Sequence, residues 1–168
     1  MTAVAFKLDH FHNPLDIAEM AMLDRDVAFD RSSDGDLLAE STSMWGPQRI
    51  WFSWQEEHQS LSLSSAMENK IPQAALPRVY ELLAYVNEKL WMGYFSFDSD
   101  QRCVAFRHTL LAGGETGQLP SQESIDELLD LATQEWDRFF PALQAVTWGS
   151  AKPKEALEMA MFETVAEA

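Results

Sequence analysis

Residues 49–64, RIWFSWQEEHQSLSLS, decide the fold class. Successive side chains of a strand point to opposite faces, so Phe52 and Trp54 share one face while Trp51 lies on the other. Residues 60–64 have the same period of two, because leucine alternates with serine. Two neighbouring runs of this kind predict a pair of antiparallel strands that packs one face on an apolar core.

Further elements are predicted on both sides of this pair. Asn13 can cap a helix that begins at Pro14, because proline suits the first helical position. The dipeptide Asp34-Gly35 between two apolar runs is typical of a β-hairpin turn. Periodicity then predicts the remaining elements, which are a helix over residues 79–90, strands over 94–97 and 103–111, a long helix opening at Ser121, and a last helix over 153–165.

The element order is therefore α-β-β-β-β-α-β-β-α-α. Strands grouped into meanders predict an α+β fold with an antiparallel sheet of five to six strands flanked by helices. We expect a single domain over residues 1–168, in which residues 1–12 form a flexible arm and residues 152–168 form the C-terminal helix.

Composition narrows the class of partner. The chain has 168 residues, with 12 basic and 27 acidic side chains and a net charge of −15. A field of this sign repels phosphate backbones and anionic lipids, so we expect neither nucleic acid nor a membrane as a partner. One cysteine, the absence of a signal-like start and the absence of a long apolar run predict a cytoplasmic protein.

Two stretches resemble metal sites and lack a necessary part. Residues 30–36 match the start of a calcium-binding EF-hand loop, but Ser41 stands where the loop needs a bidentate glutamate. A plain hairpin turn is the preferred interpretation. His10 and His12 are spaced to face one side of an extended segment, but no third ligand is visible. We therefore expect no metal and no cofactor.

Enzyme-like patterns are also incomplete. Cys103 and His108 lie five residues apart on one predicted strand and so face opposite sides. The glycine-rich residues 113–117 lack the Gly-Lys-Ser/Thr ending of a phosphate-binding loop. We expect no catalytic residues and no enzymatic activity.

The remaining indication of function is aromatic and apolar side chains that one core does not need to bury. If the sheet has one covered face, then Trp51 or Trp54 is exposed and suggests a docking surface; the alternative is a sheet covered on both faces. The last helix has apolar residues around most of its circumference, including Met159 and Phe162. It packs either on its own domain or on a second molecule.

Short motifs along the chain resemble a known family. The motifs are Asn13-Pro14-Leu15-Asp16, Phe29-Asp30-Arg31, Trp51-Phe52-Ser53-Trp54, Val79 to Trp91, Gly93, Phe106-Arg107 and Trp148-Gly149. Together, over about residues 13–166, they resemble the YbjN family of bacterial sensory transduction regulators. This resemblance implies a fold like that of type III secretion chaperones and a homodimer. It carries over no catalytic residues.

Two polar members of these motifs are costly to bury without a partner. Asn87 and Arg107 are expected to bind either a backbone group or a ligand. The leading hypothesis is a non-catalytic protein-binding module, chaperone-like or a regulatory adaptor, with an unidentified protein partner. The alternative is a small-ligand sensor or enzyme with a pocket between sheet and helices, near Asn87, Arg107 and Trp91.

Overall fold

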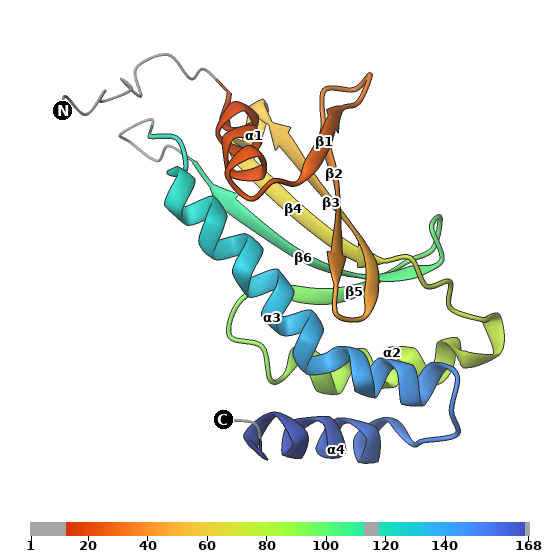
Figure 1. The fold of residues 1–168 in the computed structure, drawn as a ribbon. Coiled ribbons are helices and arrows are strands. Elements are labelled where there is room, and N and C mark those ends of the chain that lie inside the picture. Colours follow the sequence, from red (N-terminus) through yellow and green to blue (C-terminus); the bar gives the residue numbers. More distant parts are fainter. Residues whose placement is uncertain (1–12, 113–117, 167–168) are drawn as a thin grey trace.

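The computed structural model describes residues 13–112 and 118–166 (Figure 1). The fold is α+β, and its elements follow the predicted order. The helices are α1 (Pro14–Asp24), α2 (Leu76–Asn87), α3 (Gln122–Thr147) and α4 (Pro153–Ala166). The strands are β1 (Ala28–Arg31), β2 (Leu37–Ser43), β3 (Gly46–Gln55), β4 (Ser60–Met67), β5 (Tyr94–Asp98) and β6 (Cys103–Leu111).

The six strands form one antiparallel sheet in the order β1-β2-β3-β4-β6-β5. The stretch that predicted the fold lies at its centre, where Phe52 of β3 pairs with Leu63 of β4 and Trp54 pairs with Leu61. A short 3-10 turn, Glu56–His58, joins the two strands. The alternation of residues 49–64 thus gives the central hairpin, as predicted.

The β1–β2 hairpin settles the interpretation of residues 30–36. The backbone N–H of Ser32 donates to the Asp36 carbonyl at 2.8 Å, and Gly35 adopts a φ of +90°, which favours glycine. Strand β2 then continues through Ser41, whereas an EF-hand needs a helix after its loop. The prediction of a hairpin turn is confirmed.

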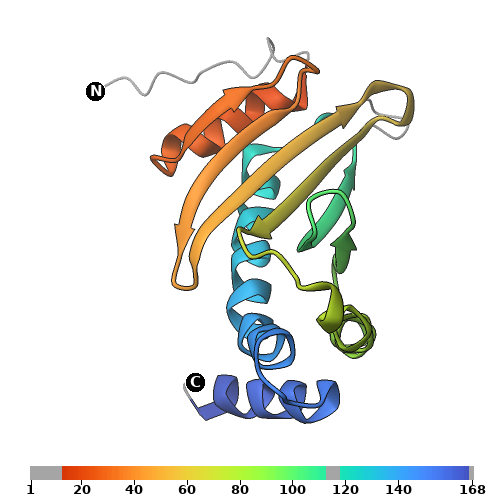
Figure 2. The same cartoon turned by 90° about the vertical axis from the view of Figure 1, so that its right-hand side faces the viewer.

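The helices cover one face of the sheet (Figure 2). Helix α1 packs on β1 to β3, α2 packs on β5, and α3 packs on β6 as well as on the other helices. Helix α4 packs on α2 and α3 and lies farther from the sheet. Between these layers, the core includes Phe52, Leu61 and Phe106, each fully buried.

Helix α3 is the central element of the helical layer. The Ser121 hydroxyl caps it by accepting the backbone N–H of Ser124 at 3.1 Å. The helix runs for 26 residues and continues through Pro141, although proline removes a backbone hydrogen bond inside a helix. At its middle, the buried Trp136 indole donates to the Ser65 carbonyl at 3.2 Å and to its hydroxyl at 3.1 Å.

The connection from α2 to β5 is held by one side chain. The helix ends at Asn87 rather than at residue 90, and the Asn87 amide donates to the Phe95 carbonyl at 3.0 Å and accepts the Phe95 N–H at 2.8 Å. Gly93 has a φ of +73°, and a Cβ there would lie 2.4 Å from the Phe106 ring. The loop of residues 88–93 therefore has little freedom at its β5 end.

One carboxyl group of α3 is buried with the core. Glu135 is 5% exposed, and the nearest cation, Arg138, lies 3.7 Å from its Oε2. Burial raises the pKa of Glu135, and the charge of Arg138 opposes the increase. A carboxylate at this position is therefore less favourable in the folded chain than in the unfolded one.

Replacing Asn87 with Ala is expected to lower the free energy of unfolding by about 1–3 kcal/mol, because the N–H and carbonyl of Phe95 both lose their partner. Urea unfolding followed by circular dichroism measures this change. Asn69→Ala is the matched control, since the structure records no side-chain hydrogen bond of Asn69 among the described residues. Equal effects of the two substitutions would contradict a structural role for Asn87.

Glu135→Gln is expected to stabilise the protein more at about pH 8 than at about pH 4. The folded-state pKa of Glu135 is raised, so its protonated form favours folding, and this contribution is lost as pH rises through that pKa. Urea unfolding of both proteins across this range measures the difference. Glu57→Gln, at an exposed position, is the control, and a difference independent of pH would refute the assignment.

Candidate functional site

The sheet has one face without a helix among residues 13–112 and 118–166 (Figure 2). The strand register places five residues in one row across that face: Leu38, Trp51, Ser64, Arg107 and Tyr94. The Trp51 ring is half-buried and packs on a small cluster of Ala66, Cys103 and Ala105. Trp54 faces the helices instead and packs on the main core. Of the two residues, Trp51 therefore belongs to the open face.

Arg107 also lies on the open face, where it closes a turn. Its Nη2 donates to Asp98 Oδ2 at 2.9 Å, and Asp98 Oδ1 accepts the backbone N–H groups of Asp100 and Gln101 at 3.0 and 2.9 Å. This ion pair joins β6 to the turn between β5 and β6. Its visible contacts are structural, like those of Asn87 with Phe95.

A hollow of about 490 Å³ opens beside Trp51. It is lined by Leu38, Ala39, Glu40, Arg49, Ile50, Trp51, Asp98 and Gln101. Arg49 is the cation of this hollow, and its Nε is buried without a hydrogen-bond partner, with Glu68 Oε1 at 3.7 Å. Glu40 pairs with Arg49 across the strands, so charges of both signs meet here.

The alternative hypothesis requires a ligand pocket between sheet and helices. Side chains fill this space. A void of about 10 Å³ remains among side chains of α2, α3, β5 and β6, about the space of one water molecule. Asn87 binds the backbone of β5, Arg107 lies on the far face of the sheet, and Trp91 is 76% exposed. These three side chains do not converge on one cavity.

Helix α4 packs on its own domain. Its inner side buries Ala156, Leu157 and Ala160 against α2 and α3. Its outer side leaves Met159 64% exposed and Phe162 76% exposed. The first alternative for this helix is thus correct, although apolar surface remains available to a second molecule.

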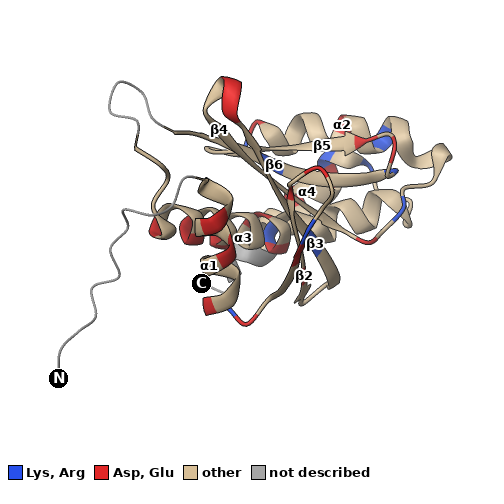
Figure 3. Ribbon diagram, turned by 90° about the horizontal axis from the view of Figure 1, so that it is seen from above, with Lys and Arg blue, Asp and Glu red and all other residues tan. Residues whose placement is uncertain are grey.

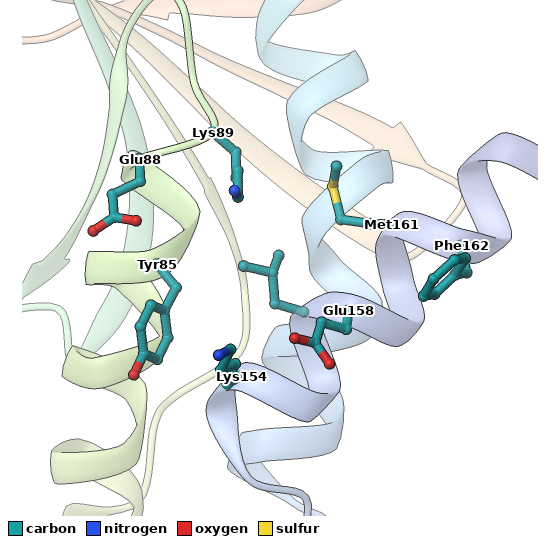
Figure 4. A pocket seen from close by; sticks show the side chains of 8 residues that line it. Tyr85, Glu88, Lys89, Lys154, Glu158, Met161 and Phe162 are labelled. Carbon is teal, nitrogen blue, oxygen red and sulfur yellow. The ribbon is translucent and has the colours of Figure 1, made fainter.

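A groove of about 520 Å³ lies between α4 and the end of α2 (Figure 4). Tyr85 of α2 and Lys154 of α4 lie on opposite walls of the groove, and Met161 and Phe162 lie farther along α4. The lining is completed by Glu88, Lys89, Leu157 and Glu158. The sequence singled out Phe162 and missed Tyr85, because one helix pattern does not reveal which helix packs beside it.

A second groove, of about 550 Å³, lies beside Trp91. Trp91 and Met92 come from the loop after α2, and Leu110 comes from β6. Helix α3 contributes Ser124, Glu127, Leu128, Asp130, Leu131 and Gln134. The polar members at 127, 130 and 134 have helical spacing, so the sequence alone shows that they share one side of α3.

Cys103 and His108 lie on opposite faces of β6, as predicted. The thiol is 2% exposed in the small cluster beneath Trp51, and burial, followed by the charge of Asp98, raises its pKa. His108 pairs with the core residue Leu63, and burial lowers the pKa of the imidazole. The two groups cannot act as a nucleophile and its base.

Two predicted features lie outside the described residues, namely His10 with His12 and the glycine-rich residues 113–117. Across the described parts of the chain, no three His, Cys, Asp or Glu side chains are grouped to hold a metal ion. Within the same ranges, no helix combines the length and the apolar character that crossing a bilayer requires.

The chain is similar to one protein family and to a solved structure of that family. The sequence profile of the YbjN family, described as "Putative bacterial sensory transduction regulator", matches residues 14–145. No curated protein matches the sequence. A crystal structure of YbjN from E. coli, described as a putative transcription regulator, superposes with a TM-score of 0.50 at 11% identity, over 91% of this chain and 92% of that chain.

The superposition shows a shared fold, and at 11% identity it carries no information on what either protein binds. The profile match spans most of the chain, and the chain has the α+β fold that the sequence motifs implied. The chain therefore belongs to the YbjN family, whose members are described as bacterial regulators.

Proposed function

We propose that this protein is a non-catalytic regulatory module, chaperone-like or an adaptor, that acts by binding other proteins and is itself a homodimer. The observation that carries the proposal is the exposure of Phe162 and Met159 beside the groove between α2 and α4. The description of the family as regulatory supports a binding role in a signalling or stress pathway.

The outer side of α4 has the composition of an interface. Burying a phenylalanine or a methionine contributes about 1.5–3 kcal/mol, and both residue types are enriched where proteins meet. The flexible side chain of Met159 adapts to differently shaped partners. Around the apolar groove, Lys89, Lys154 and Glu158 provide a polar rim, the usual surrounding of an interface centre.

The same rim suits a second copy of the chain. Two copies with a net charge of −15 each repel one another over most of their surfaces. The groove is an exception, because its lining holds two lysines, Lys89 and Lys154, and two glutamates, Glu88 and Glu158. Under twofold symmetry such a patch can pair with itself, lysine facing glutamate.

Phe162→Ser and Met159→Ser test this proposal. Each is expected to weaken dimerisation or the capture of partner proteins at least about tenfold, since a loss of 1.4 kcal/mol changes an affinity by that factor. Light scattering measures the mass of the purified protein, and affinity capture from native cells with mass spectrometry measures the partners.

Met44→Ser is the matched control, because Met44 is 74% exposed in the turn between β2 and β3 and does not line this groove. Point substitutions are preferable to removal of α4, which would uncover buried surface of α2 and α3. A protein that is monomeric and captures no partner while its unfolding transition is intact would refute the proposal.

A further inference from the structure

We infer that the groove beside Trp91 binds a segment of a protein partner that combines lysine or arginine with apolar side chains. This inference rests on the proposed protein-binding function and specifies the chemistry of one partner surface. Three features of the groove carry it: an apolar floor, an exposed indole on an anchored loop, and a rim with negative charge.

The floor comes from three elements that are far apart in the sequence. Leu128 and Leu131 of α3 are buried at the base, and the half-buried Leu110 of β6 and Met92 of the loop extend it. An extended segment of a partner therefore meets a continuous apolar surface at this place. Such grooves bind partner side chains by excluding water from both surfaces.

Trp91 stands at the side of this floor and is 76% exposed. The loop that carries it is fixed at its β5 end, where the Asn87 amide binds Phe95 and Gly93 fits against the Phe106 ring. Anchoring of the loop reduces the conformational freedom that its backbone loses on binding. Exposed tryptophans in such settings are frequent centres of protein interfaces.

The rim selects the charge of the occupant. Among the described residues that line the groove there are two carboxylates, Glu127 and Asp130, and no Lys or Arg. Arg25 binds Asp126 and Asp130, each at 2.8 Å, on the α1 side of α3. Glu127 has no such ion pair within the described part of the chain, so its charge is available to a partner.

The negative charge of the whole chain acts in the same direction at longer range. Figure 3 shows acidic residues on α1 and on the neighbouring part of α3. The net charge of −15 raises the local concentration of cations and speeds the association of basic segments. A second copy of this chain, being equally acidic, is disfavoured as the occupant.

A lysine or arginine side chain fits all three features at once. Its charged end binds the Glu127 carboxylate or lies over the Trp91 ring, whose face attracts cations. Its methylene stem packs along the apolar floor, as such stems do at interfaces. Neighbouring leucine-like residues of the same segment then cover Leu128 and Leu131.

Labelled peptides of equal length test the inference with the full chain. One peptide alternates Leu with Lys, one Leu with Glu, and one Ser with Lys, and fluorescence anisotropy measures their affinities. The Leu–Lys peptide is expected to bind at least about tenfold more tightly than either of the others. Its affinity should fall as salt screens the charges.

Two variants and two matched controls locate the site. Trp91→Ala is expected to weaken binding of the Leu–Lys peptide about tenfold, and Glu127→Gln about threefold. Trp148→Ala, at another exposed tryptophan, and Glu57→Gln, at an exposed glutamate of the turn between β3 and β4, should leave it unchanged. All four substitutions are at exposed positions, and urea unfolding confirms that the variants are folded.

Failure of the inference can be distinguished from failure of the proposed function. Equal binding of the Leu–Glu peptide, equal losses for Trp148→Ala and Trp91→Ala, or no binding by any peptide would overturn the inference. If Phe162→Ser still abolishes capture of protein partners in that case, the protein-binding function stands and only the Trp91 groove is rejected.

Discussion

The hydrogen bonds of one indole join the longest helix to the centre of the sheet. Trp136 of α3 donates to the carbonyl and hydroxyl of Ser65 on β4, and the same hydroxyl accepts the side-chain amide of Gln48 from β3 at 2.5 Å. Because buried donors without partners are costly, this network fixes both the position and the rotation of α3. The ring also packs edge-on against Phe95, with centroids 4.9 Å apart, so the α2–β5 connection is tied to the same centre.

The rotation of α3 about its axis determines which of its side chains face α4 and which line the groove beside Trp91. With Trp136 facing the sheet, Arg138 is directed to α4, where its Nη2 contacts the Met161 sulfur at 3.3 Å. Glu127 and Asp130 then line the groove beside Trp91. Side chains fill the interior, since the void among α2, α3, β5 and β6 has a volume of only about 10 Å³. Both grooves that suggest binding therefore lie on the outside of the helical layer, where partner segments can reach them.

Much of the architecture could be predicted because it depends on local pattern. The period of two in residues 49–64 gave the central hairpin, the Asn13-Pro14 start of α1 was correct, and Asp34-Gly35 marked the β1–β2 turn. The prediction for the end of α2 was less accurate. The apolar stripe continues to residue 90, but the chain leaves the helix after Asn87, whose amide binds a strand formed later in the sequence. A local pattern contains no information about that partner.

The sequence by itself determined the elements, the strand faces and the incompleteness of each enzyme-like motif, because spacing along a strand or helix fixes which side chains share a face. Only the tertiary structure decided that Trp51 rather than Trp54 belongs to the open face and that Asn87 and Arg107 bind within the fold. It also decided that Trp91 lines a groove together with residues of α3. These outcomes depend on residues that are distant in the chain and become neighbours only when the helices pack on one face of the sheet.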